Sequence, residues 1–223
     1  TTCYGFANVE AMMVEGFEAD FAEAGDVIDN EGVAKLTTSA LSLEEGVWGI
    51  AVTSAVIADV DVTFIVMGDA ELENAVAADD EELDAFEVAY LRNSFDAPEC
   101  AEALPSGVLV QVGEGEEVTL TINGAEMTVT GTALLQVLLP GDTMRMMSLS
   151  GLITLGDTIV PPGFYSTVCL GEAEDLGLDG EENDQPASCP VSGARPLTHT
   201  DLDELQAVED VEVINAISLP TII

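Results

Sequence analysis

Apolar and polar residues alternate along much of this chain with the two-residue period of half-buried β-strands. The alternation is clearest from Val60 to Val66, inside a longer range, Val33 to Met67, that is rich in valine, isoleucine and threonine. Successive side chains of a strand point to opposite faces of a sheet, so this period predicts strands that bury one face. We expect two or three strands between Val33 and Met67.

The second half of the chain repeats strand-like runs between turn signals. The strongest signal is Asn123-Gly124, which separates Val118–Ile122 from Glu126–Val129. Both turn residues tolerate the positive φ angles of a type I′ turn, so this pattern predicts a β-hairpin. Similar runs predict strands at 108–112, 133–139, 144–149, 152–155 and 164–170.

The remaining segments give weaker patterns. Residues 69–90 are rich in alanine and acids, and Asp79 to Leu83 has the composition of a solvated loop or the start of a short helix. Thr200, followed by acidic residues, is a candidate N-cap for a short helix. We expect the apolar tail, residues 211–223, to insert into a sheet, either its own or the exposed edge of a neighbour.

Together these elements predict an all-β protein, an antiparallel β-sandwich or jelly-roll of one or two domains with a short C-terminal helix. The predicted division is an N-terminal arm or strands at 1–32, a first β-domain with an acidic insertion at 33–106, a second β-domain at 107–170, and an acidic loop, helix and apolar tail at 171–223.

Charge narrows the functional classes. Forty-three acidic residues stand against four basic ones, a formal net charge of −39 at pH 7. This field repels nucleic acid, whose binding needs lysine and arginine, so we exclude nucleic-acid binding. The large negative charge suits a halophilic and a calcium-rich setting equally. The stretch from Val118 to Leu170 is almost uncharged, which indicates a face that packs under another sheet or contacts another subunit.

Calcium is the cofactor that the acidic residues favour, since it binds clustered carboxylate oxygens. We expect Asp59 and Asp61 to project from one face of a strand, and Asp175 and Asp179 lie in a crowded acidic loop. Neither group has the spacing of an EF-hand loop. A solvated acidic surface is the alternative at each of these positions.

The four cysteines favour two disulfides in an exported protein. They show no CxxC spacing, and a single histidine accompanies them, so a zinc or iron–sulfur site is disfavoured. We expect Cys169 to pair with Cys189 across an acidic, glycine-rich loop, which leaves Cys3 and Cys100 to pair within one chain or between subunits. Four buried free thiols in a cytosolic protein are the alternative.

One stretch is similar to a known family. Residues 107–171, with the runs TLTINGAEMTVTGTALLQV and SLSGLITLGDTIVPPGFYSTVCLGE, resemble the FecR-like β-domains of exported proteins in filamentous Chloroflexi-type bacteria. The C-terminal RPLT, DLDELQAVEDV and INAISLP segments are similar to the tails of those proteins. The resemblance implies an extracellular β-domain without known catalytic residues.

The sequence does not favour an enzyme. A serine or cysteine nucleophile needs a base, and His199 is the only imidazole, placed where a solvated histidine is expected. Carboxylate pairs are too abundant to single out a glycosidase, so we identify no small-molecule substrate. No stretch approaches the roughly 20 apolar residues of a membrane span. The first residue, threonine, fits removal of a signal peptide and an extracellular or cell-surface location.

These observations predict a structural subunit of an extracellular assembly, such as a filament, sheath or surface layer. We expect a homo-oligomer or homopolymer that associates through β-strands, with the apolar termini completing a neighbour's sheet. The alternative is a monomeric secreted module that binds calcium or a cell-surface polymer. The two hypotheses differ on whether the termini fold back into their own sheet.

Overall fold

A computed structural model describes residues 2–6, 8–17, 19–42, 44, 47–77, 82–93, 104–138, 143–170 and 191–209. In these residues fifteen strands form one mixed sheet, accompanied by a short 3-10 helix, η1 (Asn30–Gly32), and an α-helix, α1 (His199–Glu209). The prediction of an all-β fold with a short C-terminal helix is confirmed.

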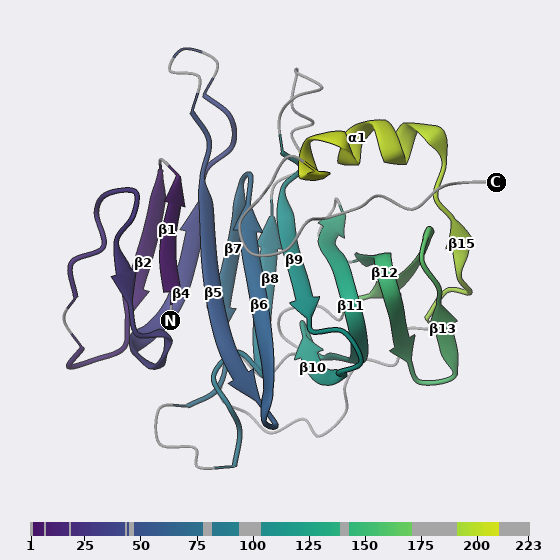
Figure 1. Cartoon of the computed structure of the whole chain (residues 1–223), viewed down its shortest axis with the longest axis horizontal. Helices are drawn as coiled ribbons and strands as arrows, with labels where there is room; N and C mark the ends of the chain where they lie inside the picture. The colour runs from purple at the N-terminus through teal and green to yellow at the C-terminus, as the bar shows by residue number, and fades with distance from the viewer. Residues whose placement is uncertain are drawn as a thin grey trace.

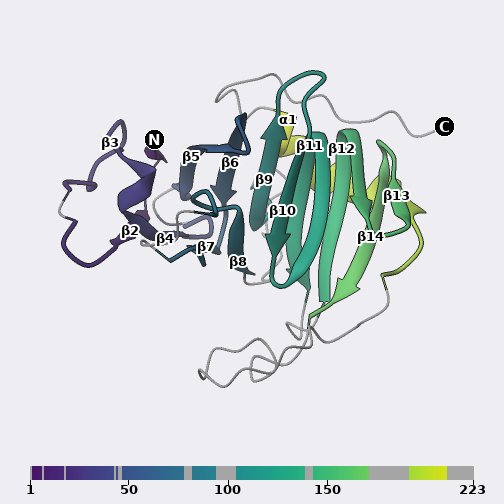
Figure 2. The same cartoon turned by 90° about the horizontal axis from the view of Figure 1, so that it is seen from below.

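The sheet folds into two layers that face each other (Figure 2). The first layer contains β2 (Val9–Met13), β4 (Val33–Thr38), β7 (Ala70–Asn74), β8 (Val88–Asn93) and β10 (Val118–Ile122). The second layer contains β3 (Val27–Ile28), β1 (Thr2–Phe6), β5 (Ile50–Ile57), β6 (Val60–Met67) and β9 (Gly107–Val112). Strands β8 and β10 pair in parallel, whereas the other strand pairs are antiparallel.

Two long strands join the layers. The first half of β11 (Ala125–Leu138) pairs with β10 and its second half pairs with β9, while β12 (Thr143–Leu155) follows it along its other edge. A register shift after Thr132 and two facing glycines, Gly131 and Gly151, mark the change of layer. Bulges of this kind allow one strand to belong to two packed sheets. Strands β13 (Thr158–Val160), β14 (Phe164–Cys169) and β15 (Arg195–Pro196) continue beyond β12.

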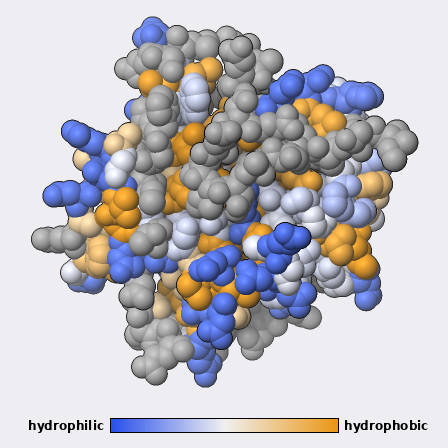
Figure 3. Space-filling view, in the orientation of Figure 1, coloured by the Kyte–Doolittle hydropathy of each residue, from blue (hydrophilic) through white to orange (hydrophobic). Residues whose placement is uncertain are grey.

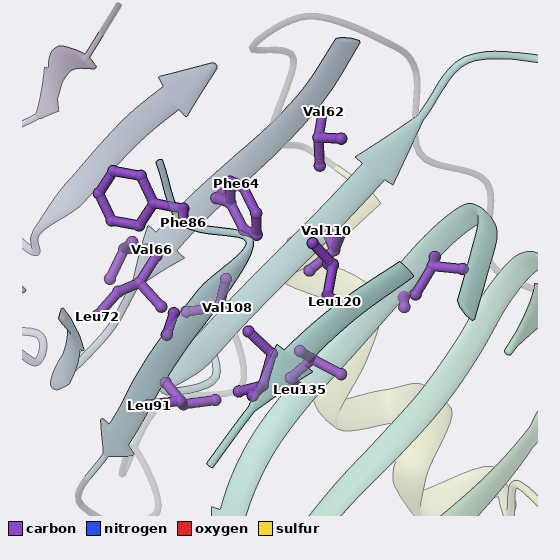
Figure 4. Close-up of a cluster of buried hydrophobic side chains, with 14 of the residues drawn as sticks. Val62, Phe64, Val66, Leu72, Phe86, Leu91, Val108, Val110, Leu120 and Leu135 are labelled. Carbon is purple, nitrogen blue, oxygen red and sulfur yellow. The ribbon is translucent and has the colours of Figure 1, made fainter. Parts of the chain in front are cut away.

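The main core lies between the two layers. In β6 and β9 the even-numbered residues, such as Phe64 and Val110, point inward. Phe64 packs against Phe86, with ring centroids 5.9 Å apart (Figure 4). The close-up also shows Val66, Leu91 and Leu135 turned toward the same cluster. Burial of such side chains, at about 25 cal/mol per Å² of apolar area, is the main source of stability.

A second apolar cluster lies on the face of the second layer that carries α1, called the outer face below (Figure 1). Five direct neighbours in five strands form a buried row there: Val52, Ile65, Leu109, Leu134 and Met147. Leu205 and Val208 of α1 pack on this cluster. Strands β6 and β9 are therefore covered on both faces, which explains why all six residues of β9 are buried.

A capping box begins α1. The backbone N–H of Thr198 donates to Asp201 Oδ2 at 2.7 Å, and the Asp201 N–H donates back to Thr198 Oγ1 at 3.3 Å. The N-cap is thus Thr198, two residues before the predicted Thr200. The guanidinium of Arg145 in β12 forms an ion pair with Asp201 and lies 4.5 Å from the centroid of the Tyr165 ring, so α1 is tied to the sheet at its first turn.

The range 69–90, for which the sequence predicted no strand, contains strand β7 and the start of β8. Leu72 is buried, and the glutamates on either side of it face outward toward basic partners. Lys35 Nζ lies 3.0 Å and Arg92 Nη1 2.9 Å from Glu71. Cross-strand pairing with scarce cations therefore stabilises an acidic strand that composition alone disfavours.

The predicted hairpin at Asn123-Gly124 is confirmed by the pairing of β10 with β11 and by φ angles of 51° and 75°. The Asn123 side chain also pairs with β8: its Oδ1 accepts from Leu91 N at 2.8 Å and its Nδ2 donates to Leu91 O at 2.9 Å. Pairing is continuous across the predicted boundary at residue 106, because β9 lies between β6 and β11. The two predicted β-domains share one sheet and one core.

The N-terminal strand belongs to the sheet of its own chain. Strand β1 pairs with β5 and β3, and the buried hydroxyl groups of Thr2 and Thr53 lie 2.7 Å apart. The apolar C-terminal tail lies outside the described residues. In the described part of the chain, no helix is long and apolar enough to cross a membrane.

Candidate functional site

A line of polar side chains crosses the outer face next to the apolar row. Its members are direct neighbours, one from each of β5, β6, β9, β11 and β12: Ser54, Thr63, Gln111, Thr132 and Ser150. We call this line the polar track. With about 4.8 Å between adjacent strands, it extends roughly 19 Å across the sheet.

Hydrogen bonds connect parts of the polar track. The Ser54 and Thr63 hydroxyl oxygens lie 3.5 Å apart, and Ser150 Oγ accepts a bond of 3.0 Å from the backbone N–H of Thr132. In Figure 3 the outer face over β11 and β12 is pale, the hydropathy of serine, threonine and glycine, with strongly hydrophilic side chains beside it. The track is thus an uncharged, hydroxyl-bearing surface at the border of the helix-covered patch.

A cleft of about 780 Å³ opens at the β11 and β12 end of the polar track. The end of β9, the loop from β9 to β10, the bend of β11 and the facing part of β12 form its walls. The residues that line it are Gln111, Val112, Gly113, Glu114, Gly115, Glu116, Glu117, Thr130, Gly131, Thr132, Ser150 and Gly151. The volume lies in the range that small-molecule and cofactor sites occupy, roughly 300–1,000 Å³.

The side chain of Gln111 is the most unusual group in the cleft. It is only 4 % exposed, and its Oε1 has no hydrogen-bond partner. An amide oxygen removed from water without a donor costs about 1–3 kcal/mol, so such groups are rare in folded proteins. Gln111 thus lines the cleft with a side chain whose amide oxygen is buried and unsatisfied.

A second buried glutamine in the same region shows the ordinary arrangement. Gln136 of β11 is 8 % exposed, and its Nε2 donates to the carbonyl oxygen of Ser106 at 2.9 Å. It does not line the cleft. The comparison separates a glutamine that stabilises the fold from one whose amide oxygen is left without a partner.

Three glutamates surround the cleft on the loop between β9 and β10. Glu114, Glu116 and Glu117 are exposed, and a turn that closes with a 3.1 Å bond from Glu116 N to Gly113 O presents them. A Cβ on residue 113 would lie 2.4 Å from Glu116 Oε2, so the glycine leaves room for this carboxylate to fold back toward the loop. The cleft thus combines carboxylates, hydroxyl groups and one desolvated amide oxygen.

The predicted calcium residues are only partly in the described chain. Asp59 lies in the turn between β5 and β6 with a φ of 66°, not on a strand, and Asp61 is exposed at the start of β6. The expectation that both project from one strand face is wrong, because Ala58 and Asp59 form the hairpin turn. Among the described residues, no three His, Cys, Asp or Glu side chains are placed so that they could together hold a metal ion. Asp175 and Asp179 lie outside that part, and calcium binding stays a prediction.

The predicted disulfides also stay predictions. Cys169 is a free, half-buried cysteine at the end of β14, and Cys189 and Cys100 lie outside the described residues. Cys3 is placed in β1 by its backbone pairing with Val52. His199 is exposed as the first residue of α1.

Sequence reasoning missed Gln111 and the loop glutamates. Gln111 interrupts the apolar run Val108 to Val112, and a single polar residue inside a fully buried strand is a signal that could have been noticed. Its alignment with Thr132 and Ser150 depends on strand register, which the sequence does not reveal.

No family model, curated protein or solved structure matches this chain. The resemblance of residues 107–171 to FecR-like domains therefore stays a prediction. The functional proposal below depends on the geometry of the cleft and the polar track.

Proposed function

We propose that this protein is an extracellular binding module whose polar track and cleft hold a cell-surface polymer. One observation supports this most directly: the buried Oε1 of Gln111, in the middle of the track and in the wall of the cleft, has no donor. This oxygen is closed to solvent in the free protein, and a rotation of the Gln111 side chain, which lines the cleft, would let a ligand with hydroxyl or amino groups supply the donor. The proposal concerns binding without catalysis.

The shape of the site supports an extended ligand. Hydroxyl groups at regular strand spacing offer repeated hydrogen bonds along a line, whereas a compact ligand would use the cleft alone. Gln111, Thr132 and Ser150 belong both to the track and to the lining of the cleft. A linear polysaccharide carries hydrogen-bonding groups at regular intervals and fits this arrangement.

The test compares Gln111→Leu with the matched variant Gln136→Leu. Replacing an unsatisfied amide by an apolar group of similar size is neutral or stabilising, so we expect the free energy of unfolding of Gln111→Leu to be unchanged or higher by about 1 kcal/mol. Gln136→Leu leaves the Ser106 carbonyl without its donor and should lose about 1–3 kcal/mol. Urea denaturation measures both.

Binding is then measured on an array of immobilised cell-wall and extracellular polysaccharides. We expect wild type and Gln136→Leu to bind the same polymer and Gln111→Leu to bind it at least tenfold more weakly. If Gln111→Leu lowers stability while binding is unchanged, Gln111 is a structural residue. If wild type binds no polymer on the array, the proposed function is wrong.

We also propose a second candidate, self-association through β-strands into a filament, sheath or surface layer. Strands β2 and β3 end the two layers at the same end of the molecule, and they expose Met12 (58 %) and Val27 (59 %). Exposed apolar edge strands are common sites of strand addition. Donation of the N-terminal strand is disfavoured, since β1 pairs with β5 of its own chain.

A further inference from the structure

The side-chain atoms of the cleft that carry charge or have no partner are all hydrogen-bond acceptors. Its side-chain acceptors include the Gln111 Oε1 and the carboxylates of Glu114, Glu116 and Glu117. The Ser150 hydroxyl oxygen already accepts from Thr132 N, and Thr130 Oγ1 accepts from Leu152 N at 2.9 Å. A ligand for this cleft must therefore bring donors.

The negative charge of the cleft has no partner within it. None of the described residues that line the cleft is lysine, arginine or histidine. Three of the four basic residues of the chain, Lys35, Arg92 and Arg145, form ion pairs with carboxylates elsewhere. The loop carboxylates thus keep their charge available to a ligand.

We propose that the polymer bound in the cleft is cationic, an amino-sugar polysaccharide whose ammonium groups bind Gln111 Oε1 and the loop carboxylates. This inference rests on the proposed function. An ammonium group donates three hydrogen bonds. It also brings a positive charge, and no described residue that lines the cleft supplies one to Glu114, Glu116 and Glu117. Hydrogen bonds to charged groups are about twice as strong as neutral ones, so the amine adds affinity that a neutral sugar cannot.

The geometry divides the recognition between two surfaces. Hydroxyl groups of the sugar chain bind Thr132 and Ser150 along the polar track, and the amine binds at the β9 end, where Gln111 meets the loop. The desolvated amide oxygen distinguishes this from diffuse attraction to an acidic protein, because it favours one donor at one position. Exposed carboxylates alone attract any cation weakly and are screened by salt.

The experiment is isothermal titration calorimetry with two matched probes, a glucosamine tetramer and its fully N-acetylated counterpart, at a pH at which the free amines are protonated. The two probes share one backbone and differ in charge. We expect one binding site per chain, with the glucosamine tetramer at least about tenfold tighter at moderate salt. Titration with calcium chloride alone tests whether any small cation suffices.

Two triple variants separate the cleft from the overall field. The first replaces Glu114, Glu116 and Glu117 by glutamine, and the second replaces three exposed glutamates elsewhere, Glu10, Glu23 and Glu204. Both variants lose three charges. We expect the first, and also Gln111→Leu, to lose at least tenfold in affinity for the glucosamine tetramer, and the second to lose less than twofold.

Each other result contradicts the inference in a distinct way. Equal weakening by both triple variants, or binding abolished by moderate salt, means diffuse charge attraction. Equal or tighter binding of the neutral tetramer overturns the cationic ligand and leaves the binding module intact. If calcium binds at the cleft and neither tetramer binds, the ligand of the cleft is a metal ion and not a polymer. If the polymer that binds on the array carries no amine, the cationic ligand is likewise overturned and the binding module is left intact.

Discussion

At the scale of single residues, glycine allows β11 and β12 to approach each other at the wall of the cleft. Gly151 has a φ of 68°, and a Cβ at this position would lie 1.3 Å from the Thr130 carbonyl oxygen. Its partner Gly131 has a φ of 100°. The close approach turns both strands from one layer to the other and places Thr130 and Ser150 around the cleft.

We expect Gly151→Ala to lower the free energy of unfolding by roughly 3 kcal/mol or more, because the backbone of β11 must move. Gly156→Ala is the matched control, since Gly156 also has a positive φ, 51°, but no atom lies within 4 Å of its Cβ position. It should lose only about 1 kcal/mol from backbone strain. Urea denaturation compares the two, and equal losses would mean that strain alone, not the approach of the strands, requires the glycine.

At the scale of elements, α1 protects the apolar cluster of the outer face and depends on one carboxylate. Burial raises the pKa of Asp201, but hydrogen bonds from Thr198 and the Arg145 guanidinium outweigh it, so the pKa lies below its ordinary value. A lowered carboxyl pKa stabilises the fold above the unfolded-state pKa, about 4, and this stability is lost as pH falls through the folded-state pKa.

Asp201→Asn should therefore destabilise the protein near neutral pH, and its effect should diminish as the pH falls below the unfolded-state pKa, about 4, and through the lower folded-state pKa, where the folded carboxylate becomes protonated. Denaturation curves at a series of pH values measure the difference between variant and wild type. Asp203→Asn, an exposed change in the same helix, should differ little from wild type at any pH. A difference for Asp201→Asn that stays constant down to strongly acidic pH would show that the carboxylate charge is not involved.

At the scale of the whole molecule, the net charge of −39 opposes any contact between two copies. The apolar residues Met12 and Val27 on the two terminal strands favour such a contact. Salt or divalent cations reduce the repulsion, because the screening length is only about 8 Å at physiological ionic strength. Self-association, where it occurs, should consequently require salt or calcium.

For the self-association candidate, electron microscopy and sedimentation of the protein with and without a chelator give the test. We expect wild type to assemble in the presence of calcium, and the double variant with Met12→Lys and Val27→Lys to stay monomeric, since charged edge strands resist pairing. Val56→Lys is the control, because Val56 is 57 % exposed on an internal strand. Monomeric wild type in both conditions would contradict self-association and leave the binding module unaffected.

Some elements could be predicted because their signals are local. Asn123-Gly124 adopts the expected hairpin turn, and Val60 to Val66 lie in strand β6 as expected. Strand β7 was missed because its acidic composition resembles a loop, while the partners that accommodate it, β4 with Lys35 and β8 with Arg92, are distant in the sequence. The cleft was missed for a similar reason: Gln111 is next to Thr132 and Ser150 only through lateral pairing.

The sequence by itself determined the strand content, the Asn123-Gly124 turn and the large negative charge, because alternation, turn chemistry and net charge are properties of local segments or of simple sums. Only the tertiary structure decided the polar track, since its members, from Ser54 to Ser150, become neighbours through the register of five strands. It also decided which glutamine has an unsatisfied oxygen. Burial and hydrogen bonding depend on what packs around a side chain, and for Gln111 those neighbours are distant in the sequence.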